Sequence, residues 1–423
     1  MKGEGSILPP RLNSAITTGE PFRGRSRYSP ADLQTAVRSI ARPRISVLTP
    51  AWASVVAALG LSIFGILAIQ SVAPAEASRQ VAFLCLGVIA AAGATVVHYR
   101  VYEFFSPLMM AVVLMLLVFV LIPSVPESIV RPRNGARRWI TIPGLLEFQP
   151  SELAKIAYVL LLGVYLTTRR HYRHFLGISA PLVLTFIPMA LILKEPDLGT
   201  SLLFLPTLFA MLVVAGSRLH HLLIIGVLGL ALGASMYPVL EDHQKERIAA
   251  LADHWTGKRA MLQDEGFQGN KAMTLVGAGQ LTGLGGDDGR ILVTRNRLPE
   301  DHNDMIFAVV SVRWGFLGAV AMWGMYVLLG LGAILTAAQT SEPYGRLVVI
   351  GLAAMLFAQM VVNTGMTVGL LPITGMTLPF VSYGGSSLIS VWVMVGIILS
   401  VGLRWPQYLA REARDFDTFE TED

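Results

Sequence analysis

Long apolar runs separated by short polar connections constrain this chain more than any other feature. Of its 423 residues, 53% are hydrophobic and only 14% are charged, whereas soluble domains are usually ~25% charged. Stretches long enough to cross ~30 Å of hydrocarbon recur along the chain. We therefore expect an all-α polytopic membrane protein, with residues 49–406 as its transmembrane domain. Its spans, about ten, are expected at residues 51–72, 80–98, 104–123, 153–168, 178–194, 198–216, 220–239, 304–337, 345–368 and 387–404.

Basic residues in the short connections predict which side of the membrane each connection faces. Lys and Arg gather in cytoplasmic loops, and this chain carries Arg169 and Arg170 after the fourth apolar run and Arg218 after the sixth. With ten spans these connections share one side with both termini. We therefore expect cytoplasmic ends, with a basic tail at residues 1–48 and an acidic tail at 407–423. The basic tail at 1–48 holds eight Lys and Arg against three Asp and Glu, so the chain's net charge of +5 does not indicate nucleic-acid binding.

The connection at residues 124–152 breaks this pattern, because it is basic although it falls on the outer side. It holds Arg131, Arg133, Arg137 and Arg138. Guanidinium groups bind phosphate and carboxylate oxygens through paired hydrogen bonds. The cluster therefore predicts binding of an anionic ligand at the outer face. The alternative is contact with the headgroups of the outer leaflet.

Two polar motifs lie at the outer ends of neighbouring apolar runs. Glu152 and Lys155 are three residues apart, which places them on one helix face. Ionisable groups at membrane depth are costly and usually line a polar cavity, a reading we favour over a local ion pair of little net energy. Asp197 follows Pro196 in the short turn between the fifth and sixth runs, where we expect it to cap the next helix.

The connection at residues 240–303 is expected to form a large extracytoplasmic loop between spans seven and eight. Long loops in compact domains often carry function. The glycines between Gly266 and Gly286 predict backbone that packs closely against another segment. At the end of the loop, Asp304 stands where the eighth apolar run begins. It either caps that helix or acts as a partly desolvated carboxylate that serves as a general base.

The stretch at residues 363–387 alternates apolar residues with Gly, Pro and hydroxyl side chains and lacks helical periodicity. Non-helical backbone at membrane depth requires protein or a cavity around it. No metal signature stands out, and the single cysteine, Cys85, lies within an apolar run. The sequence therefore predicts no resident cofactor. A divalent cation stays open, because the sequence shows no ligand set for one.

Four of these motifs resemble those of the SEDS family (shape, elongation, division and sporulation), whose best-known members are RodA and FtsW. In chain order they are Asn134-Gly-Ala-Arg-Arg-Trp-Ile140, Gln149-Pro-Ser-Glu152 with Lys155, Pro196-Asp-Leu-Gly-Thr200, and the stretch 363–387. The resemblance spans about residues 50–405. It implies a multi-pass protein of the bacterial inner membrane that polymerises lipid II into peptidoglycan glycan strands. It also implies a crosslinking partner, a class B penicillin-binding protein, among other elongasome or divisome membrane proteins.

The resemblance also implies residue roles. The family's essential acid lies in a Pro-Glu-x-His-Thr-Asp-Phe-Ile-Phe stretch, which maps onto Pro299–Phe307 and makes Asp304 the catalytic residue. The motifs and their charges together predict a set of substrate-binding residues: Arg137, Arg138, Trp139, Gln149, Glu152, Lys155, Ser382, Tyr383, Gly384 and Ser386. One departure stands out, because Val312 and Arg313 replace a Glu-Glu pair of the family. Whether the chain is RodA-like or FtsW-like stays open.

A different class of function also fits the charges. A transporter that flips lipid II or another polyprenyl-linked precursor would need cations and a polar cavity as well. It would carry polar residues through the bilayer and show repeat symmetry. Several apolar runs here are almost wholly apolar at their centres, and the polar motifs gather at one face. This pattern favours chemistry at the membrane surface over passage through it.

Overall fold

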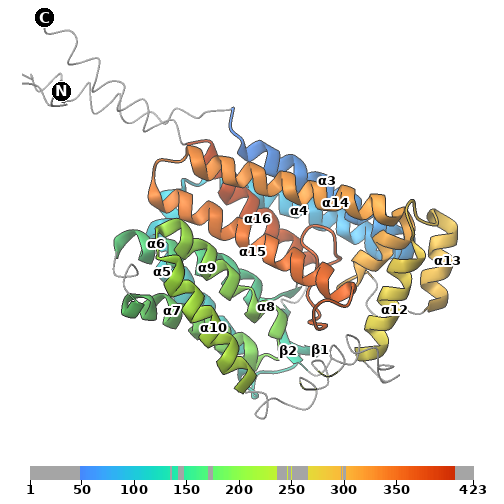
Figure 1. Ribbon diagram of the computed structural model, residues 1–423, viewed down its shortest axis with the longest axis horizontal. Coiled ribbons are helices and arrows are strands. Elements are labelled where there is room, and N and C mark those ends of the chain that lie inside the picture. Colours follow the sequence, from blue (N-terminus) through green and yellow to red (C-terminus); the bar gives the residue numbers. More distant parts are fainter. Residues whose placement is uncertain are drawn as a thin grey trace, which may run out of the picture. The chain divides into compact units, whose positions relative to one another are not determined.

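The structure, a computed structural model, describes six stretches and three single residues: 48–133, 136–141, 147–169, 175–235, 265–296 and 302–404, with Lys245, Ala249 and Leu298. Its regular structure is mostly helical (Figure 1). The helices in chain order are α3 (Ala51–Val72), α4 (Pro74–Val96), α5 (Tyr99–Leu121), α6 (Pro150–Thr168), the 3-10 helix η2 (Phe175–Ile178), α7 (Ser179–Lys194), α8 (Leu198–Leu202), α9 (Phe204–Ala215), α10 (Leu219–Ser235), α12 (Glu265–Ala278), α13 (Gly286–Asn296), α14 (Ile306–Gln339), α15 (Pro343–Thr367) and α16 (Gly385–Gly402).

Within the described residues, eight helices are long and apolar enough to cross a membrane, which confirms the polytopic helical architecture. One of the eight combines α8 and α9, which meet at a turn at Leu203. The predicted spans at 178–194 and 220–239 correspond to α7 and α10, which have only 16 and 17 residues. The count of ten spans and the side that each connection faces stay predictions.

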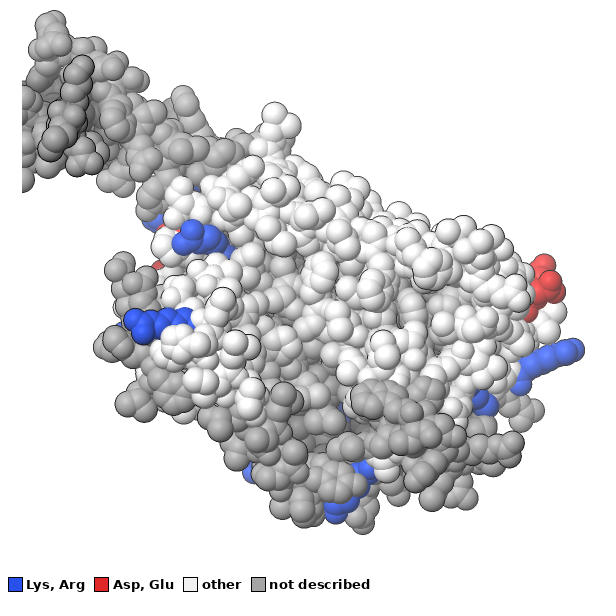
Figure 2. Space-filling view, viewed as in Figure 1, with Lys and Arg blue, Asp and Glu red and all other residues white. Residues whose placement is uncertain are grey.

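The outer surface of the helices is apolar in the way that a lipid-facing protein requires. Large hydrophobic side chains are exposed along several helices, among them Ile89 of α4, Phe104 of α5 and Val320 of α14. On the face shown in Figure 2, the described charged side chains lie toward the edges and leave a broad uncharged area between them. Hydrocarbon solvates such a surface, whereas water would penalise it.

Three of the long helices begin with a proline in the first turn: α4 at Pro74, α6 at Pro150 and α15 at Pro343. Proline suits this position because its missing N–H would have no partner within the helix and its φ is already helical. The most deeply buried of the long helices are α6, α15 and α16. They form the core against which the other helices pack, so their polar residues must find partners inside the protein.

The connection between α5 and α6 contains a small antiparallel sheet, which the helical expectation did not include. Its strands are β1 (Val130–Arg133), β2 (Ala136–Thr141) and β3 (Glu147–Phe148), in the order β1-β2-β3. Val130 pairs with Ile140, and both pack on Val120 near the end of α5. This hydrophobic contact fixes the register of the strand that carries the arginine pair.

Helix α14 is broken at Gly315, whose φ of 64° and ψ of −159° interrupt the helical conformation. The segment 279–285, between α12 and α13, completes the hydrogen bonds at the break. Leu284 and Gly285 donate to the carbonyls of Val312 and Arg313, at 2.8 and 3.2 Å. Gln280 and Leu281 accept from the N–H groups of Phe316 and Leu317, at 2.8 and 3.1 Å.

The glycines of this loop permit the close approach that the sequence predicted. A Cβ atom added to Gly279 would lie 1.9 Å from the carbonyl oxygen of Ser311. One added to Gly283, whose φ is +81°, would lie 2.3 Å from that of Arg313. No side chain fits at such distances, so the loop can approach the backbone of α14 only if these two positions are glycine. It thereby supports the half of α14 that follows Asp304.

Candidate active site

The arginines of β2 are held by backbone carbonyls from other segments. Arg137 donates through Nη1 to the carbonyl of Pro123 at 3.0 Å and through Nη2 to that of Val125 at 2.6 Å. Arg138 donates through Nε to the carbonyl of Glu195 at 2.6 Å and through Nη2 to that of Pro196. These acceptors are neutral, so both guanidinium groups keep their positive charge while their positions are fixed.

The turn between α7 and α8 is therefore anchored to β2. Asp197 caps α8, as predicted, because its Oδ1 accepts from the N–H of Thr200 at 3.0 Å. Its Oδ2 accepts from Nε2 of Gln149 at 3.0 Å. Gln149 is the residue that precedes Pro150 at the start of α6. The predicted motifs at residues 149–155 and 196–200 thus meet at one point.

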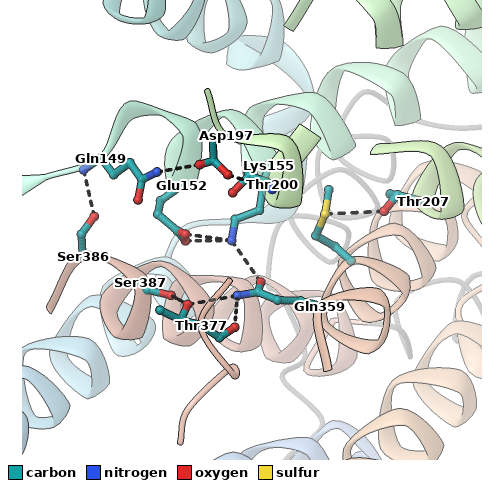
Figure 3. A network of polar contacts seen from close by, with 11 residues as sticks. Gln149, Glu152, Lys155, Asp197, Thr200, Thr207, Gln359, Thr377, Ser386 and Ser387 are labelled. Atoms are coloured by element: carbon teal, nitrogen blue, oxygen red, sulfur yellow. Dashed lines mark hydrogen bonds and ion pairs between the residues drawn. The ribbon is translucent and has the colours of Figure 1, made fainter. Parts of the chain in front are cut away.

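Glu152 and Lys155 form an ion pair inside the protein (Figure 3). The Nζ atom of Lys155 lies 2.9 Å from Oε2 and 3.0 Å from Oε1 of Glu152. It also donates to Oε1 of Gln359, on α15, at 3.1 Å. Lys155 is 1% exposed and Glu152 is 4% exposed. The ion-pair reading is therefore correct, but the pair is buried, where its energetics differ from those of a surface pair.

Gln359 and two serines extend this network to the non-helical segment that precedes α16 (Figure 3). Nε2 of Gln359 donates to the carbonyl of Thr377 at 2.9 Å, and the hydroxyl of Thr377 lies 3.1 Å from that of Ser387. The neighbouring Ser386 accepts from the N–H of Gln149 at 3.1 Å. Helices α6, α15 and α16 are thus joined at the same end by side-chain hydrogen bonds.

The residues predicted around 382–384 hold the shape of this segment. The hydroxyl of Ser382 accepts from the N–H of Leu378 at 2.7 Å. Gln80, buried on α4, donates to the carbonyl of Ser382 at 2.9 Å and accepts from the N–H of Gly384 at 3.3 Å. The side chain of Tyr383 interacts with Glu76 and Arg79 of α4, and burial raises the pKa of its phenol. Side chains satisfy backbone groups that no helix or sheet pairs here.

The turn that carries Asp304 packs against the same segment. Nδ2 of Asn363 donates to the carbonyl of Asp304 at 2.7 Å and to that of Met376 at 2.6 Å. The N–H of Tyr383 donates to the carbonyl of His302 at 2.9 Å. The half-buried Asp304 faces Gly375, where an added Cβ would lie 3.7 Å from Oδ2. The N-cap residue of α14 is Met305, and both alternatives for Asp304, a helix cap and a general base, stay predictions.

These contacts connect many of the predicted site residues. The path runs from Arg138 through the 195–197 turn and Gln149 to Ser386, and from Lys155 through Gln359 to Thr377. The segment that contains Thr377 also meets the Asp304 turn. Trp139, on β2 beside Arg138, is partly exposed.

Arg313, where the family has an acid, contacts α3. Its Nη1 donates to the carbonyl of Leu67, and its guanidinium lies 4.6 Å from the centre of the Trp314 ring. That ring stacks on Phe64 of α3 at 4.5 Å. Cation–π and aromatic contacts of this kind fasten one helix to another. Arg313, whose charge is opposite to that of the family's acid, therefore helps to join α14 to α3.

Among the described residues, no group of three or more His, Cys, Asp or Glu side chains could hold a metal ion. The acids in the turn beside Arg138 are Glu195 and Asp197, and Asp197 already accepts hydrogen bonds from Thr200 and Gln149. Arg138 acts electrostatically on Glu195 and would oppose a cation there. The described donor set does not fit a resident divalent cation.

Sequence reasoning missed three polar residues that join the site together: Gln80, Glu195 and Gln359. Gln80 and Gln359 are 1% exposed, and each lies on a helix with few other polar residues. A single amide in an apolar helix is a signal for a hydrogen bond across helices. For Glu195 the signal is an acid directly before Pro196, between two apolar runs.

Comparisons with known proteins agree with this geometry. The family of cell cycle proteins that comprises FtsW, RodA and SpoVE matches residues 44–404. Stage V sporulation protein E of Bacillus subtilis is 34% identical over 336 residues, which are 78% of this chain and 88% of that protein. The probable peptidoglycan glycosyltransferase FtsW of Geobacter metallireducens is 32% identical over 361 residues, 82% of this chain and 93% of its own.

Solved structures show the same fold. One of them is described as "Structural coordination of polymerization and crosslinking by a peptidoglycan synthase complex". A chain of that structure superimposes with a TM-score of 0.71 and 31% identity, over 83% of this chain and 97% of that one. The rod shape determining protein RodA of Thermus thermophilus superimposes with a TM-score of 0.62 and 29% identity, over 84% and 97%.

The fold and site define a multi-pass helical membrane protein with a polar network at one end of its helices. This chain belongs to the FtsW, RodA and SpoVE family of cell cycle proteins.

Proposed function

We propose that this protein is a peptidoglycan glycosyltransferase that polymerises lipid II into glycan strands at the outer face of the bacterial inner membrane. The observation that carries the proposal is the continuous network from Arg138 to the Asp304 turn, through residues 374–387. It places fixed cations and a half-buried carboxylate on one framework. The printed names of the FtsW relatives support the same activity.

Arg137, Arg138 and Lys155 are assigned to the donor pyrophosphate. Both arginines are fixed by neutral carbonyls, so their charge is available to an anion. Guanidinium groups bind phosphate oxygens bidentately. Cations positioned before the reaction stabilise the negative charge that develops as the lipid pyrophosphate leaves. Lys155 is buried beside Glu152, so it acts on the pyrophosphate from within the protein.

Asp304 is assigned as the general base. As a hydroxyl oxygen of the acceptor sugar attacks the anomeric carbon of the donor, its proton passes to the Asp304 carboxylate. The bond from the anomeric carbon to the pyrophosphate oxygen breaks, and the electron pair leaves with the lipid pyrophosphate. Direct attack of this kind inverts the anomeric centre. The half-buried setting of Asp304 against Gly375 supports a base that is partly desolvated and still reachable.

A covalent glycosyl-enzyme would need a second free carboxylate and would retain the configuration. Glu152 is the candidate for that role. Its burial keeps the carboxylate away from a sugar, and its ion pair with Lys155 at 2.9 Å occupies it, so both argue against a covalent intermediate. Inversion by direct attack is the mechanism we propose.

A lipid II flippase is the second candidate function. Passage of an anionic headgroup needs polar groups through the depth of the bilayer. Within the described helices the buried charged residues are Glu152 and Lys155, which pair near one end of α6. The other buried charged residues, Glu195, Asp197 and Arg404, lie just beyond helix ends. This distribution favours chemistry at the surface.

The proposal includes a partner and an orientation. The matched chain from a peptidoglycan synthase complex supports assembly with a crosslinking enzyme, a class B penicillin-binding protein. Both termini and the tails at 1–48 and 407–423 are assigned to the cytoplasm, and residues 240–303 to the outer side. Residues 240–264 of that loop, apart from Lys245 and Ala249, and nearly all of both tails lie outside the described residues.

Polymerisation of lipid II by the purified protein, with and without its partner, tests the proposal. D304N keeps the size of the side chain but removes its ability to take a proton. A general base contributes ~10²–10⁴-fold, so glycan synthesis should fall by about that factor while membrane insertion and lipid II binding persist. D287N is the matched control, because Asp287 is an exposed acid on α13. Near-normal synthesis by D304N would end the catalytic assignment, and movement of lipid II across vesicles without synthesis would favour the flippase.

A further inference from the structure

Glu195 is a buried acid that the proposed chemistry does not use. It is the residue after α7, in the turn that leads to α8, and it is 1% exposed. Among the described residues, neither of its carboxylate oxygens has a hydrogen-bond partner. Its own carbonyl oxygen, by contrast, accepts from Nε of Arg138 at 2.6 Å. The backbone of Glu195 thus binds an arginine of the site, while its buried carboxyl group remains available to act on that arginine.

The charges around Glu195 favour its neutral form. Asp197 in the same turn repels the ionised carboxylate, Arg138 from β2 attracts it, and Lys194 precedes it at the end of α7. On α6, Glu152 and Lys155 pair with each other. Desolvation disfavours the charged form of a carboxyl. Burial, reinforced by Asp197 and opposed by Arg138, raises the pKa of Glu195 to about 8.

We infer that Glu195 is a positioning residue that controls donor binding through Arg138: neutral Glu195 leaves the charge of Arg138 available to the pyrophosphate, and ionised Glu195 cancels it. The inference rests on the proposed function, because it takes the lipid pyrophosphate as the ligand of Arg138. In the part of the chain that the structure describes, Arg138 donates to neutral carbonyls through Nε and Nη2 alone. The other N–H donors of its guanidinium therefore stay free for phosphate oxygens.

Ionisation of Glu195 would change this arrangement in two ways. A buried carboxylate without partners would draw the Arg138 guanidinium toward itself and away from the two carbonyls. It would also place a second negative charge, beside Asp197, next to an anionic ligand. Linkage is reciprocal, so a bound pyrophosphate in turn favours the protonated carboxyl. Donor affinity should fall as the pH rises through the pKa of Glu195.

The test compares the KM for lipid II at pH 7 and pH 9 in the purified full-length protein and in E195Q, which cannot ionise. The neutral fraction of a group with pKa about 8 falls from about 0.9 to about 0.1 over this range. If only the neutral form binds, the KM of the wild type divided by that of E195Q rises about tenfold. The ratio of their kcat values should stay constant, because E195Q leaves the proposed base, Asp304, unchanged.

D287N is the matched control, because it removes a carboxylate from an exposed position on α13 and should keep the pH profile of the wild type. Thermal unfolding in detergent checks that E195Q folds, and E195L replaces it if the amide is not tolerated. An equal rise of KM in the wild type and in the folded Glu195 variant would overturn the inference.

Direct binding of lipid II over the same pH range separates this inference from the proposed function. If the purified wild type does not polymerise lipid II, the proposed function fails. Binding that weakens with pH in the wild type and not in E195Q would still support the role of Glu195. Binding with the same pH dependence in both proteins would refute it.

Discussion

The buried pair of Glu152 and Lys155 offers a test that separates folding from ligand binding. K155M keeps the length of the side chain and removes its charge. Glu152, 4% exposed, would then remain as a buried carboxylate without its partner at 2.9 Å. Breaking one side of a buried ion pair costs about 3–5 kcal/mol. Gln359 would lose the donor to its Oε1 as well, which adds an unsatisfied amide oxygen.

The double variant E152Q/K155M removes both charges and should recover much of this loss. Replacing a buried ion pair by uncharged side chains of similar volume is often close to neutral. The free energy of unfolding is measured by SDS titration in mixed micelles, and lipid II binding is measured on the same preparations. We expect K155M to be destabilised by about 3–5 kcal/mol, the double variant to be closer to wild type, and both to bind lipid II more weakly.

Two results would refute this reasoning. If the double variant is as unstable as K155M, the cost does not come from an unpaired Glu152 carboxylate. If the double variant is stable and binds lipid II like the wild type, Lys155 is part of the framework and does not act on the pyrophosphate. E342Q supplies a control. Glu342 forms an ion pair as Glu152 does, but its partner is Arg100, at 3.1 Å, and this pair is more exposed.

Two further predictions concern the donor site and the topology. R137A and R138A should each weaken lipid II binding in equilibrium assays by about 1.5–3 kcal/mol, the value of a charge-assisted hydrogen bond; wild-type affinity in both would remove the pyrophosphate assignment. Reporter fusions should read cytoplasmic at Arg170, Ser217 and Glu412 and external at Arg133, His254 and Gly375; a cytoplasmic signal at His254 would exclude the ten-span arrangement.

The sequence predicted the long helices well, because apolar length alone determines them. It also predicted that Asp197 caps α8, a local effect within four residues. The sheet of β1, β2 and β3 was missed because its pairing depends on packing against Val120 at the end of α5. That contact is not visible in a strand of four residues with two arginines and a proline.

The insertion of residues 279–285 at the break of α14 was only half predicted. The glycines indicated a close approach, but nothing in their spacing named the partner. The partner is a second glycine, Gly315, whose positive φ exposes the backbone groups that the loop satisfies. Two segments had to be read together, 30 residues apart, and each alone resembles an ordinary turn or helix.

Contacts between distant segments also explain why the sequence predicted the motifs of the site but not how they are joined. Each motif could be recognised on its own, but the groups that join them are single side chains: Gln80, Gln359 and Asn363. All three donate to carbonyls of residues 376–382, the part of the chain where neither helix nor sheet pairs the backbone. An unpaired carbonyl at membrane depth is expensive, so these amides stabilise the segment as well as shape it. Asn363 also donates to the carbonyl of Asp304, and Gln359 accepts from Lys155, so a change in the conformation of this segment would move the proposed base relative to the proposed cationic residues. The catalytic geometry that we propose therefore depends on three amides that take no part in the proposed chemistry.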